Sequence, residues 1–190
     1  MPGLQAARGT ALTADDDPPA VAPVSAPPIR HRRSLVTLFA VAFGVWAADV
    51  VSKSLVVAMR ADQPPLNVLG SWLRIVYTRN PGAAFSLGTG MTLVFSLVAL
   101  VVVVVIVRTA PRLGSVGWAV ALGGLLGGAL GNLTDRLFRG PGPLRGYVVD
   151  WIQVPHYPVF NLADSAIVCS AVLMVVLSLR GIQLDGTRTR

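Results

Sequence analysis

Several residue types that build common protein sites are scarce in this sequence. Its 190 residues include one cysteine (Cys169), one lysine (Lys53) and no glutamate. A single cysteine excludes a disulfide framework within the chain and a cysteine-ligated zinc site. The two histidines, His31 and His156, are too few and too far apart in the sequence for a histidine-based metal cage. We therefore expect no metal and no cofactor, and we interpret Cys169 as a small apolar residue.

Charged residues are also scarce. They make up 13% of the chain, whereas 53% of the residues are hydrophobic; a soluble domain usually carries about 25% charged residues. The formal net charge is +7, but the basic residues are scattered between apolar runs and form no stripe. Nucleic acid is therefore excluded as a partner, and the composition is that of a membrane protein.

Four apolar runs predict four membrane spans. They cover residues 34–59, 85–107, 113–134 and 159–179. Each run is close to the roughly 20 residues that a helix needs to cross a bilayer. The sequence therefore predicts an all-α membrane protein with four transmembrane helices.

The two ends of the chain differ in composition from the apolar middle. Residues 1–33 are rich in proline, alanine and small polar residues and lack periodicity, so we expect a disordered cytoplasmic tail. No apolar stretch follows a short basic start, so we expect no cleavable signal peptide. Residues 34–180 form the predicted membrane domain, and residues 181–190 a cytoplasmic C-terminal tail.

The arginines predict the orientation. Basic residues concentrate in cytoplasmic segments of membrane proteins. One side of the predicted bundle carries the cluster before the first span, the link between the second and third spans, and the C-terminus: Arg30, Arg32, Arg33, Arg108, Arg112, Arg180, Arg188 and Arg190. We therefore expect both termini in the cytoplasm and both long connections, residues 60–84 and 135–158, outside.

The first outer connection contains a stretch with strand-like composition. Residues 66–79, "LNVLGSWLRIVYTR", show partial alternation between "QPP" and "NPG". Either a short extracytoplasmic sheet or an interfacial amphipathic helix fits, because Trp72 and Tyr77 suit the lipid headgroup region.

Two short motifs place polar groups near the outer ends of the first two spans. In "DVVSK", Asp49 and Lys53 are four residues apart and can pair on one helix face. A structural ion pair is favoured, and direct contact with a substrate is the alternative. In "RNPGAAFS", Gly82 permits close backbone approach at the turn before Phe85. The amide of Asn80 could hold a peptide backbone.

The third span is rich in glycine. "GGLLGGALGN" contains glycines four residues apart on two adjacent lines, which lets helices approach closely. Helix packing is the favoured interpretation, and a ligand groove is the alternative. Asn132, Asp135 and Arg136 follow in "GNLTDR". Asp135 and Arg136 are adjacent in sequence, so we expect each to pair with groups on other segments.

Two aspartates flank the fourth span. Asp150 lies in "GYVVDW" and Asp164 in "FNLADSA", joined by a connection with two prolines that can fold back. Two carboxylates brought together at low dielectric share a proton, so one can activate water while the other protonates a leaving group. The alternative is that each aspartate caps a helix or pairs with an arginine such as Arg136.

Together these motifs resemble the bacterial lipoprotein signal peptidases (signal peptidase II). That family shows Asp-x-x-x-Lys, Asn-x-Gly-Ala-Ala-Phe, Gly-Asn-x-x-Asp-Arg, Val-Val-Asp and Phe-Asn-x-Ala-Asp in this order. Here they appear as "DVVSK", "NPGAAF", "GNLTDR", "VVD" and "FNLAD", across roughly residues 35–180.

The resemblance implies a membrane aspartic endopeptidase without metal or cofactor. Its substrates would be diacylglyceryl-modified prolipoproteins, cut just before the lipidated lipobox cysteine. It implies an inner-membrane monomer in contact with lipids, with the active site at the outer face. The catalytic pair would be Asp150 and Asp164. Substrate-binding or supporting residues would be Asn80, Gly82, Asn132, Arg136, Asn161, Asp135, Asp49 and Lys53.

The sequence departs from the family pattern at two places. Val50 follows Asp49 where many members carry Gln, and residues 137–149 are longer than in many members. This longer segment, with "PGP" and two additional arginines, could form an external flap or contact anionic lipids.

Two other functional classes fit parts of the sequence. A small proton-coupled carrier could use Asp49, Asp150 and Asp164 as a relay, but a carrier should also show polar groups near mid-membrane on several helices. A scaffolding subunit could dock through the glycine face, but that leaves the two aspartates unexplained.

Overall fold

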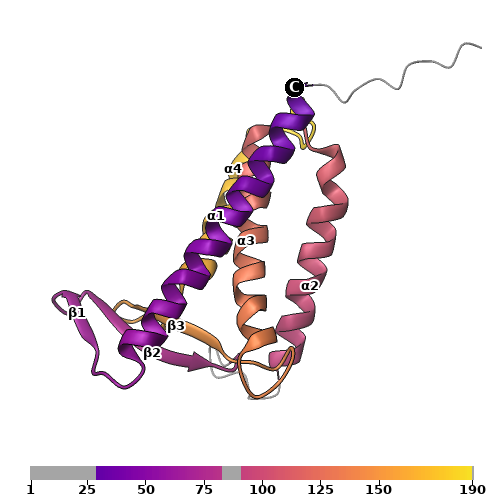
Figure 1. Cartoon of the computed structure of the whole chain (residues 1–190). Helices are drawn as coiled ribbons and strands as arrows, with labels where there is room; N and C mark the ends of the chain where they lie inside the picture. Colours follow the sequence, from indigo (N-terminus) through magenta and orange to yellow (C-terminus); the bar gives the residue numbers. More distant parts are fainter. Residues whose placement is uncertain (1–28, 83–90, 190) are drawn as a thin grey trace, which may run out of the picture.

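The chain folds as four long helices with a small sheet at one end (Figure 1). The computed structural model describes residues 29–82 and 91–189. The helices are α1 (Ile29–Arg60), α2 (Thr92–Thr109), α3 (Val116–Phe138) and α4 (Leu162–Leu179), and the 3-10 helix η2 (Ala110–Arg112) follows α2. All four are long and apolar enough to cross a membrane. The prediction of a mostly helical, four-span membrane protein is confirmed.

Three of the helices, α1, α3 and α4, begin at other residues than predicted. α1 begins at Ile29 rather than Ser34, because "RHRR" contains no helix breaker and arginine favours the helix. Residues 29–33 are therefore helical, while the rest of the predicted tail lies outside the described residues. The predicted start of α2 at Phe85 also lies outside them. α4 begins at Leu162, where Asn161 caps it.

α3 continues beyond its predicted end. It runs to Phe138 rather than Thr134, so Asp135 and Arg136 lie on the helix and not after it. The sequence "LTDRLF" contains neither glycine nor proline, and the next breakers are Gly140 and Pro141. The uncharged apolar run therefore ends one turn before the helix does.

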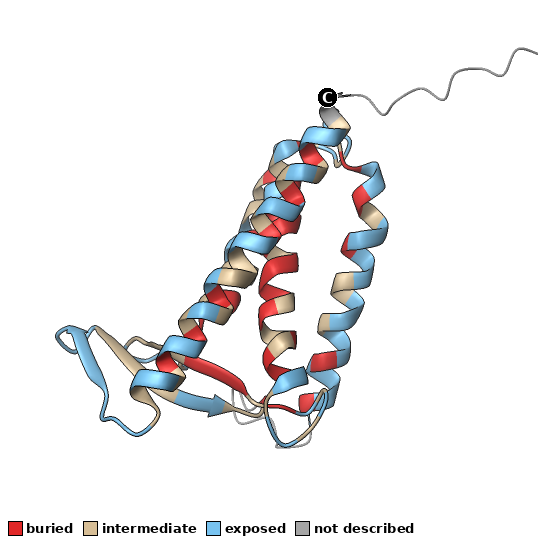
Figure 2. Ribbon diagram, viewed as in Figure 1, coloured by how far each residue is buried: buried red, intermediate tan, exposed pale blue. Residues whose placement is uncertain are grey.

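α3 is the central helix of the bundle, and it contacts α1, α2 and α4. Of its most apolar stretch, 61% is buried, against 17–22% for the other three helices. In Figure 2 red, buried segments follow α3, while pale blue, exposed segments cover much of the other helices. The exposed side chains of α2 and α4 are largely apolar, which suits contact with lipid tails rather than water.

The glycines of α3 pack against both neighbouring helices. A Cβ at Gly127 would lie 2.5 Å from the carbonyl oxygen of Ala42 on α1, and one at Gly128 would lie 2.6 Å from that of Ala163 on α4. One line of glycines (Gly123, Gly127, Gly131) therefore faces α1, and the other (Gly124, Gly128) faces α4. The packing interpretation is confirmed, and a ligand groove along the glycines is wrong because helix backbones fill it.

Replacing Gly127 with alanine is expected to destabilise the bundle. The added methyl group meets backbone of α1, so the two helices must separate, at a cost of about 1–3 kcal/mol. Gly44 on α1 is the matched control, because a Cβ there meets nothing within 4 Å. Gly44→Ala should leave the thermal unfolding temperature in detergent unchanged or raise it. Equal unfolding temperatures for the two variants would show that the glycines do not set the helix spacing.

The sheet has the strand order β1-β2-β3 and is antiparallel throughout. It consists of β1 (Leu66–Leu69), β2 (Leu73–Asn80) and β3 (Val148–Gln153). Of the two alternatives for residues 66–79, the sheet is confirmed. β3 was not predicted, although its run of β-branched and aromatic residues, "YVVDWIQV", is typical of a strand.

The described chain ends lie together, at the end of the bundle opposite the sheet (Figure 1). The predicted C-terminal tail is in part folded: the carbonyl oxygen of Leu184 accepts hydrogen bonds from the amides of Gly114 and Ser115. The indole of Trp118 donates to the carbonyl oxygen of Ile182 at 2.8 Å. These contacts tie the end of the chain to the start of α3.

Candidate active site

A cavity of about 380 Å³ lies between the sheet and helices α2, α3 and α4. Its polar groups include Asp150 on β3, Asp164 on α4, and Asn132 and Arg136 on α3. Its apolar walls come mainly from the three helices: Phe95, Val98, Ala99, Val102, Leu125, Ala129 and Ile167. The cavity thus joins a polar site next to the sheet to an apolar space within the membrane-spanning part.

Asp150 is buried in this site, with 2% of its surface exposed. Both of its oxygens accept hydrogen bonds from amide side chains: Oδ2 from Asn80 Nδ2 at 2.8 Å, and Oδ1 from Asn161 Nδ2 at 2.6 Å. Thr78 of β2 lies opposite Asp150 on β3, so Asn80 reaches the carboxylate along a diagonal on the same face. Pairing of β2 with β3 therefore brings Asn80 to Asp150.

Asp164 lies in the first turn of α4 and takes part in the helix cap. Its Oδ2 accepts the backbone amide of Asn161, and Asn161 Oδ1 accepts the backbone amide of Asp164. This reciprocal pair is a capping box. The other oxygen, Oδ1, accepts Asn132 Nδ2 at 2.8 Å. The alternative that this aspartate caps a helix is therefore correct, and it is compatible with a place in the cavity.

The three asparagines are held in one amide orientation each. Asn80 Oδ1 accepts the amide of Gly82, which turns its Nδ2 toward Asp150. Asn132 Oδ1 accepts Lys53 Nζ at 2.9 Å, which turns its Nδ2 toward Asp164. Asn161 is fixed by the capping box in the same way. Among the described residues, the side-chain oxygens of the two aspartates accept hydrogen bonds from the side-chain amides of the three asparagines and from the backbone amide of Asn161.

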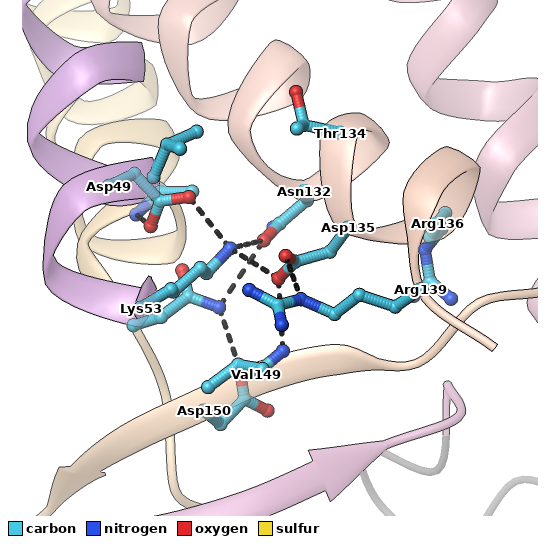
Figure 3. A network of polar contacts seen from close by, with 12 residues as sticks. Asp49, Lys53, Asn132, Thr134, Asp135, Arg136, Arg139, Val149 and Asp150 are labelled. Carbon is cyan, nitrogen blue, oxygen red and sulfur yellow. Dashed lines mark hydrogen bonds and ion pairs between the residues drawn. The ribbon is translucent and has the colours of Figure 1, made fainter. Parts of the chain in front are cut away.

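Asp49, Lys53 and Asp135 form a buried ion cluster behind the asparagines (Figure 3). Lys53 Nζ lies 2.7 Å from Asp49 Oδ2 and 3.1 Å from Asp135 Oδ2, and neither Lys53 nor Asp49 is exposed. Asp49 Oδ1 accepts the amide of Ala163, and Asp135 Oδ2 accepts the amide of Val149. The predicted structural pair of Asp49 and Lys53 is confirmed.

This cluster braces the backbone beside both cavity aspartates. Val149 immediately precedes Asp150, and Ala163 immediately precedes Asp164. Each of the two amides donates to a carboxylate of the cluster, at 3.0 Å and 2.9 Å respectively. Asp49 on α1 and Asp135 on α3 therefore position residues of β3 and α4.

Arg136 lines the cavity without an ion pair to either cavity aspartate among the described residues. Its Nη1 donates to the carbonyl oxygen of Gly146 at 3.4 Å, and its guanidinium lies 5.9 Å from the ring centroid of Phe95. The alternative that Arg136 forms an ion pair with Asp150 or Asp164 is therefore wrong for the described residues. Gly82, at a φ of +106°, packs under the same Phe95 ring.

The pKa of Asp150 is raised to about 6. Burial is the largest cause, because it disfavours the charged form, and the nearby charge of Asp164 acts in the same direction. The hydrogen bonds from Asn80 and Asn161 and the charge of Lys53 oppose the rise. Asp150 can therefore hold a proton under conditions in which an ordinary aspartate is ionised.

Some members of the site were missed in the sequence. Arg139 pairs with Asp135 at 2.5 Å, and its spacing of four residues along the helix could have identified the pair. The amides of Val149 and Ala163 carry no side-chain signal and require the fold. Among the residues that the structure describes, no group of three or more His, Cys, Asp and Glu side chains could hold a metal ion.

Comparison with known proteins identifies the family. A family model described as "Signal peptidase (SPase) II" matches residues 41–180. The chain belongs to the signal peptidase II family. Proteins named lipoprotein signal peptidase match over most of its length: 53% identity to one from Streptomyces coelicolor, over 83% of this chain and 78% of the relative. One from Rhodococcus jostii is 50% identical, over 92% and 86% respectively.

Solved structures agree with this assignment. Two structures described as a bacterial membrane enzyme, at 1.9 Å and 2.3 Å resolution, each superimpose with a TM-score of 0.67. They are 27% and 26% identical, and the matches cover 76% and 82% of this chain and 94% of each solved chain. As a signal peptidase II family member the chain is a multi-pass membrane peptidase, so the carrier and scaffold hypotheses are set aside.

Proposed function

We propose that this peptidase removes the signal peptide from diacylglyceryl-modified prolipoproteins, on the N-terminal side of the lipidated lipobox cysteine, with Asp150 and Asp164 as its catalytic pair. The observation that carries the proposal is the cavity itself. Two carboxylates with neutral amide donors face an apolar space between membrane-spanning helices. A peptide bond next to an acylated cysteine combines the same two properties, a polar reacting group and hydrocarbon chains.

The proposed chemistry is hydrolysis by one water molecule. Asp164 takes a proton from water as the water oxygen attacks the carbonyl carbon, while protonated Asp150 donates a hydrogen bond to the carbonyl oxygen. The tetrahedral intermediate then collapses, the carbon–nitrogen bond breaks, and the amide nitrogen leaves with a proton returned by the pair. One water is consumed, and the shared proton is restored.

The remaining predicted site residues have supporting roles in this proposal. Asn80, Asn132 and Asn161 hold the two carboxylates, and the ion cluster holds the backbone next to them. Arg136 and Gly82 line the cavity and would contact the peptide. The arginine distribution supports cytoplasmic termini and a sheet at the outer face of the bacterial plasma membrane. We propose that the enzyme works there as a monomer.

Cleavage of a lipidated substrate tests the proposal. The full chain in detergent is incubated with diacylglyceryl-modified prolipoprotein and, in parallel, with the same precursor without lipid. We expect cleavage of the lipidated form, with a product mass that begins at the modified cysteine. Equal cleavage of both forms, or a cut elsewhere, would contradict the proposed specificity.

The proposal also predicts a pH dependence. If Asp150 must be protonated, kcat/KM should fall as the pH rises above the pKa of about 6, by about tenfold per unit once the group is ionised. A pH series of initial cleavage rates measures this fall. A rate that keeps rising through pH 9 would contradict the assignment of Asp150 as the acid.

A further inference from the structure

Arg139 lies just beyond α3, and no residue of the proposed catalytic pair touches it. Its Nε lies 2.5 Å from Asp135 Oδ1, while Asp135 Oδ2 binds both Lys53 and the amide of Val149. Figure 3 shows the chain of contacts that runs from Asp49 through Lys53 and Asp135 to Arg139. The two oxygens of Asp135 thus have separate partners.

The positive and negative charges of this ion cluster balance only when Arg139 is counted with Asp49, Lys53 and Asp135. Among the described residues, Lys53 is the one cation that pairs with both Asp49 and Asp135, and it also donates to Asn132. Two buried carboxylates with one ammonium would leave a net negative charge where exposure is 5% or less. A buried unpaired charge is costly. Arg139, 21% exposed at the edge of the cluster, supplies the second positive charge.

We infer that Arg139 is a positioning residue of the active site: it neutralises Asp135, so that Lys53 stays shared between α1 and α3 and β3 stays fixed beside Asp150. The inference rests on the proposed catalytic pair. Without Arg139, Lys53 would be drawn toward Asp135, and its hydrogen bond to Asn132 would weaken. Because Asn132 donates to Asp164 and Val149 precedes Asp150, both catalytic aspartates lose part of their support.

The charges that act on Asp150 come from every element around it. They are Asp164 on α4, Lys53 on α1 and Arg136 on α3, with the amides of Asn80 on β2 and Asn161 before α4. Loss of the Arg139 charge makes the cluster next to them more negative. The pKa of Asp150 should therefore rise, and the pH profile of cleavage should move to higher pH, by about half a unit at the effective dielectric of a partly exposed site.

The test compares three variants of the full chain in detergent: Arg139→Gln, Arg139→Lys and Arg145→Gln. Arg145 is the matched control, because it is exposed in the same connection and its replacement by glutamine removes the same charge. We expect Arg139→Gln to lower kcat about tenfold with little change in KM, and to shift the pH profile upward. Arg139→Lys should keep the wild-type profile and recover most of kcat, and Arg145→Gln should match the wild type.

The outcomes separate this inference from the proposed function. If the wild type cleaves and Arg139→Gln has the same kcat and pH profile, Arg139 does not position the site, while the proposed function stands. If kcat falls equally in Arg139→Gln and Arg139→Lys with an unchanged profile, the residue is only structural and the inference is wrong. If Arg139→Gln does not fold, a shifted profile in Arg139→Lys contradicts the inference and an unshifted one supports it. A wild type that never cleaves lipidated substrate overturns the proposed function itself.

Discussion

Replacing Asp150 with asparagine is expected to lower kcat for prolipoprotein cleavage by about 10³-fold or more. General acid and base groups contribute about 10²–10⁴-fold, and asparagine can neither hold nor return the shared proton. Asp164→Asn should have an effect of the same size, because each aspartate depends on the other. Single-turnover cleavage of a diacylglyceryl-modified precursor, followed on a gel, measures both.

Asp62→Asn is the control for these variants. Asp62 is exposed in the connection that follows α1, and the substitution is chemically identical. It should leave kcat within about twofold of wild type. Both catalytic variants should remain monodisperse and helical, since asparagine retains the size of the side chain. Full activity in a folded Asp150→Asn variant would mean that this carboxyl group takes no part in the reaction.

Replacing Lys53 with methionine is expected to be the most destabilising substitution in the bundle. Lys53 is fully buried between two carboxylates, so its loss leaves both without a shared cation inside the protein. Removal of one partner of a buried pair costs about 3–5 kcal/mol, which corresponds to a fall of about 10 °C in the unfolding temperature of a chain of this size. Thermal unfolding in detergent measures it.

Arg32→Met provides the comparison for that substitution. Arg32 is an exposed cation on the same helix, so its loss removes one positive charge without exposing a buried partner. Its unfolding temperature should stay within about 2 °C of wild type. If Lys53→Met is as stable as Arg32→Met, the cluster of Asp49, Lys53 and Asp135 does not hold the helices together.

The existence of the four helices could be predicted from apolar runs, but their ends could not. An apolar run indicates which residues contact lipid or the protein core, but a helix can continue beyond the end of the apolar run. α3 continues through Asp135 because Lys53, Arg139 and the amide of Val149 accommodate a buried carboxylate there. Lys53 and Val149 lie in other elements, so a pattern local to α3 could have indicated only Arg139, four residues from Asp135.

The residues of the candidate site could be predicted from the motifs, but the strand pairing and the backbone hydrogen bonds that hold them together could not. The motifs placed Asp150, Asp164 and three asparagines in one site, and the cavity contains both aspartates with Asn80 and Asn132. The sheet that joins Asn80 to Asp150 depends on β3, which begins with the motif "VVD" but was interpreted as part of the connection before the fourth span. The hydrogen bonds from the backbone amides of Val149 and Ala163 to the ion cluster could not be predicted from residue types, because every residue except proline has a backbone amide.

The glycines of α3 show how a sequence pattern can leave two structures open. Spacing by four residues allows both close helix packing and a bare groove. The backbones of α1 and α4 occupy the space in front of Gly127 and Gly128, and the cavity instead opens on the side of α3 that faces α2. Only the placement of the neighbouring helices distinguishes these two outcomes.

The central claim is that Asp150 and Asp164 together hydrolyse the bond before a lipidated cysteine. The most direct test is the product mass from a diacylglyceryl-modified prolipoprotein incubated with wild type, Asp150→Asn or Asp164→Asn, each confirmed as folded and monodisperse. We predict a product that starts at the modified cysteine with the wild type alone. That same product at a wild-type rate from either variant, or no such product from the folded wild type, would contradict the claim.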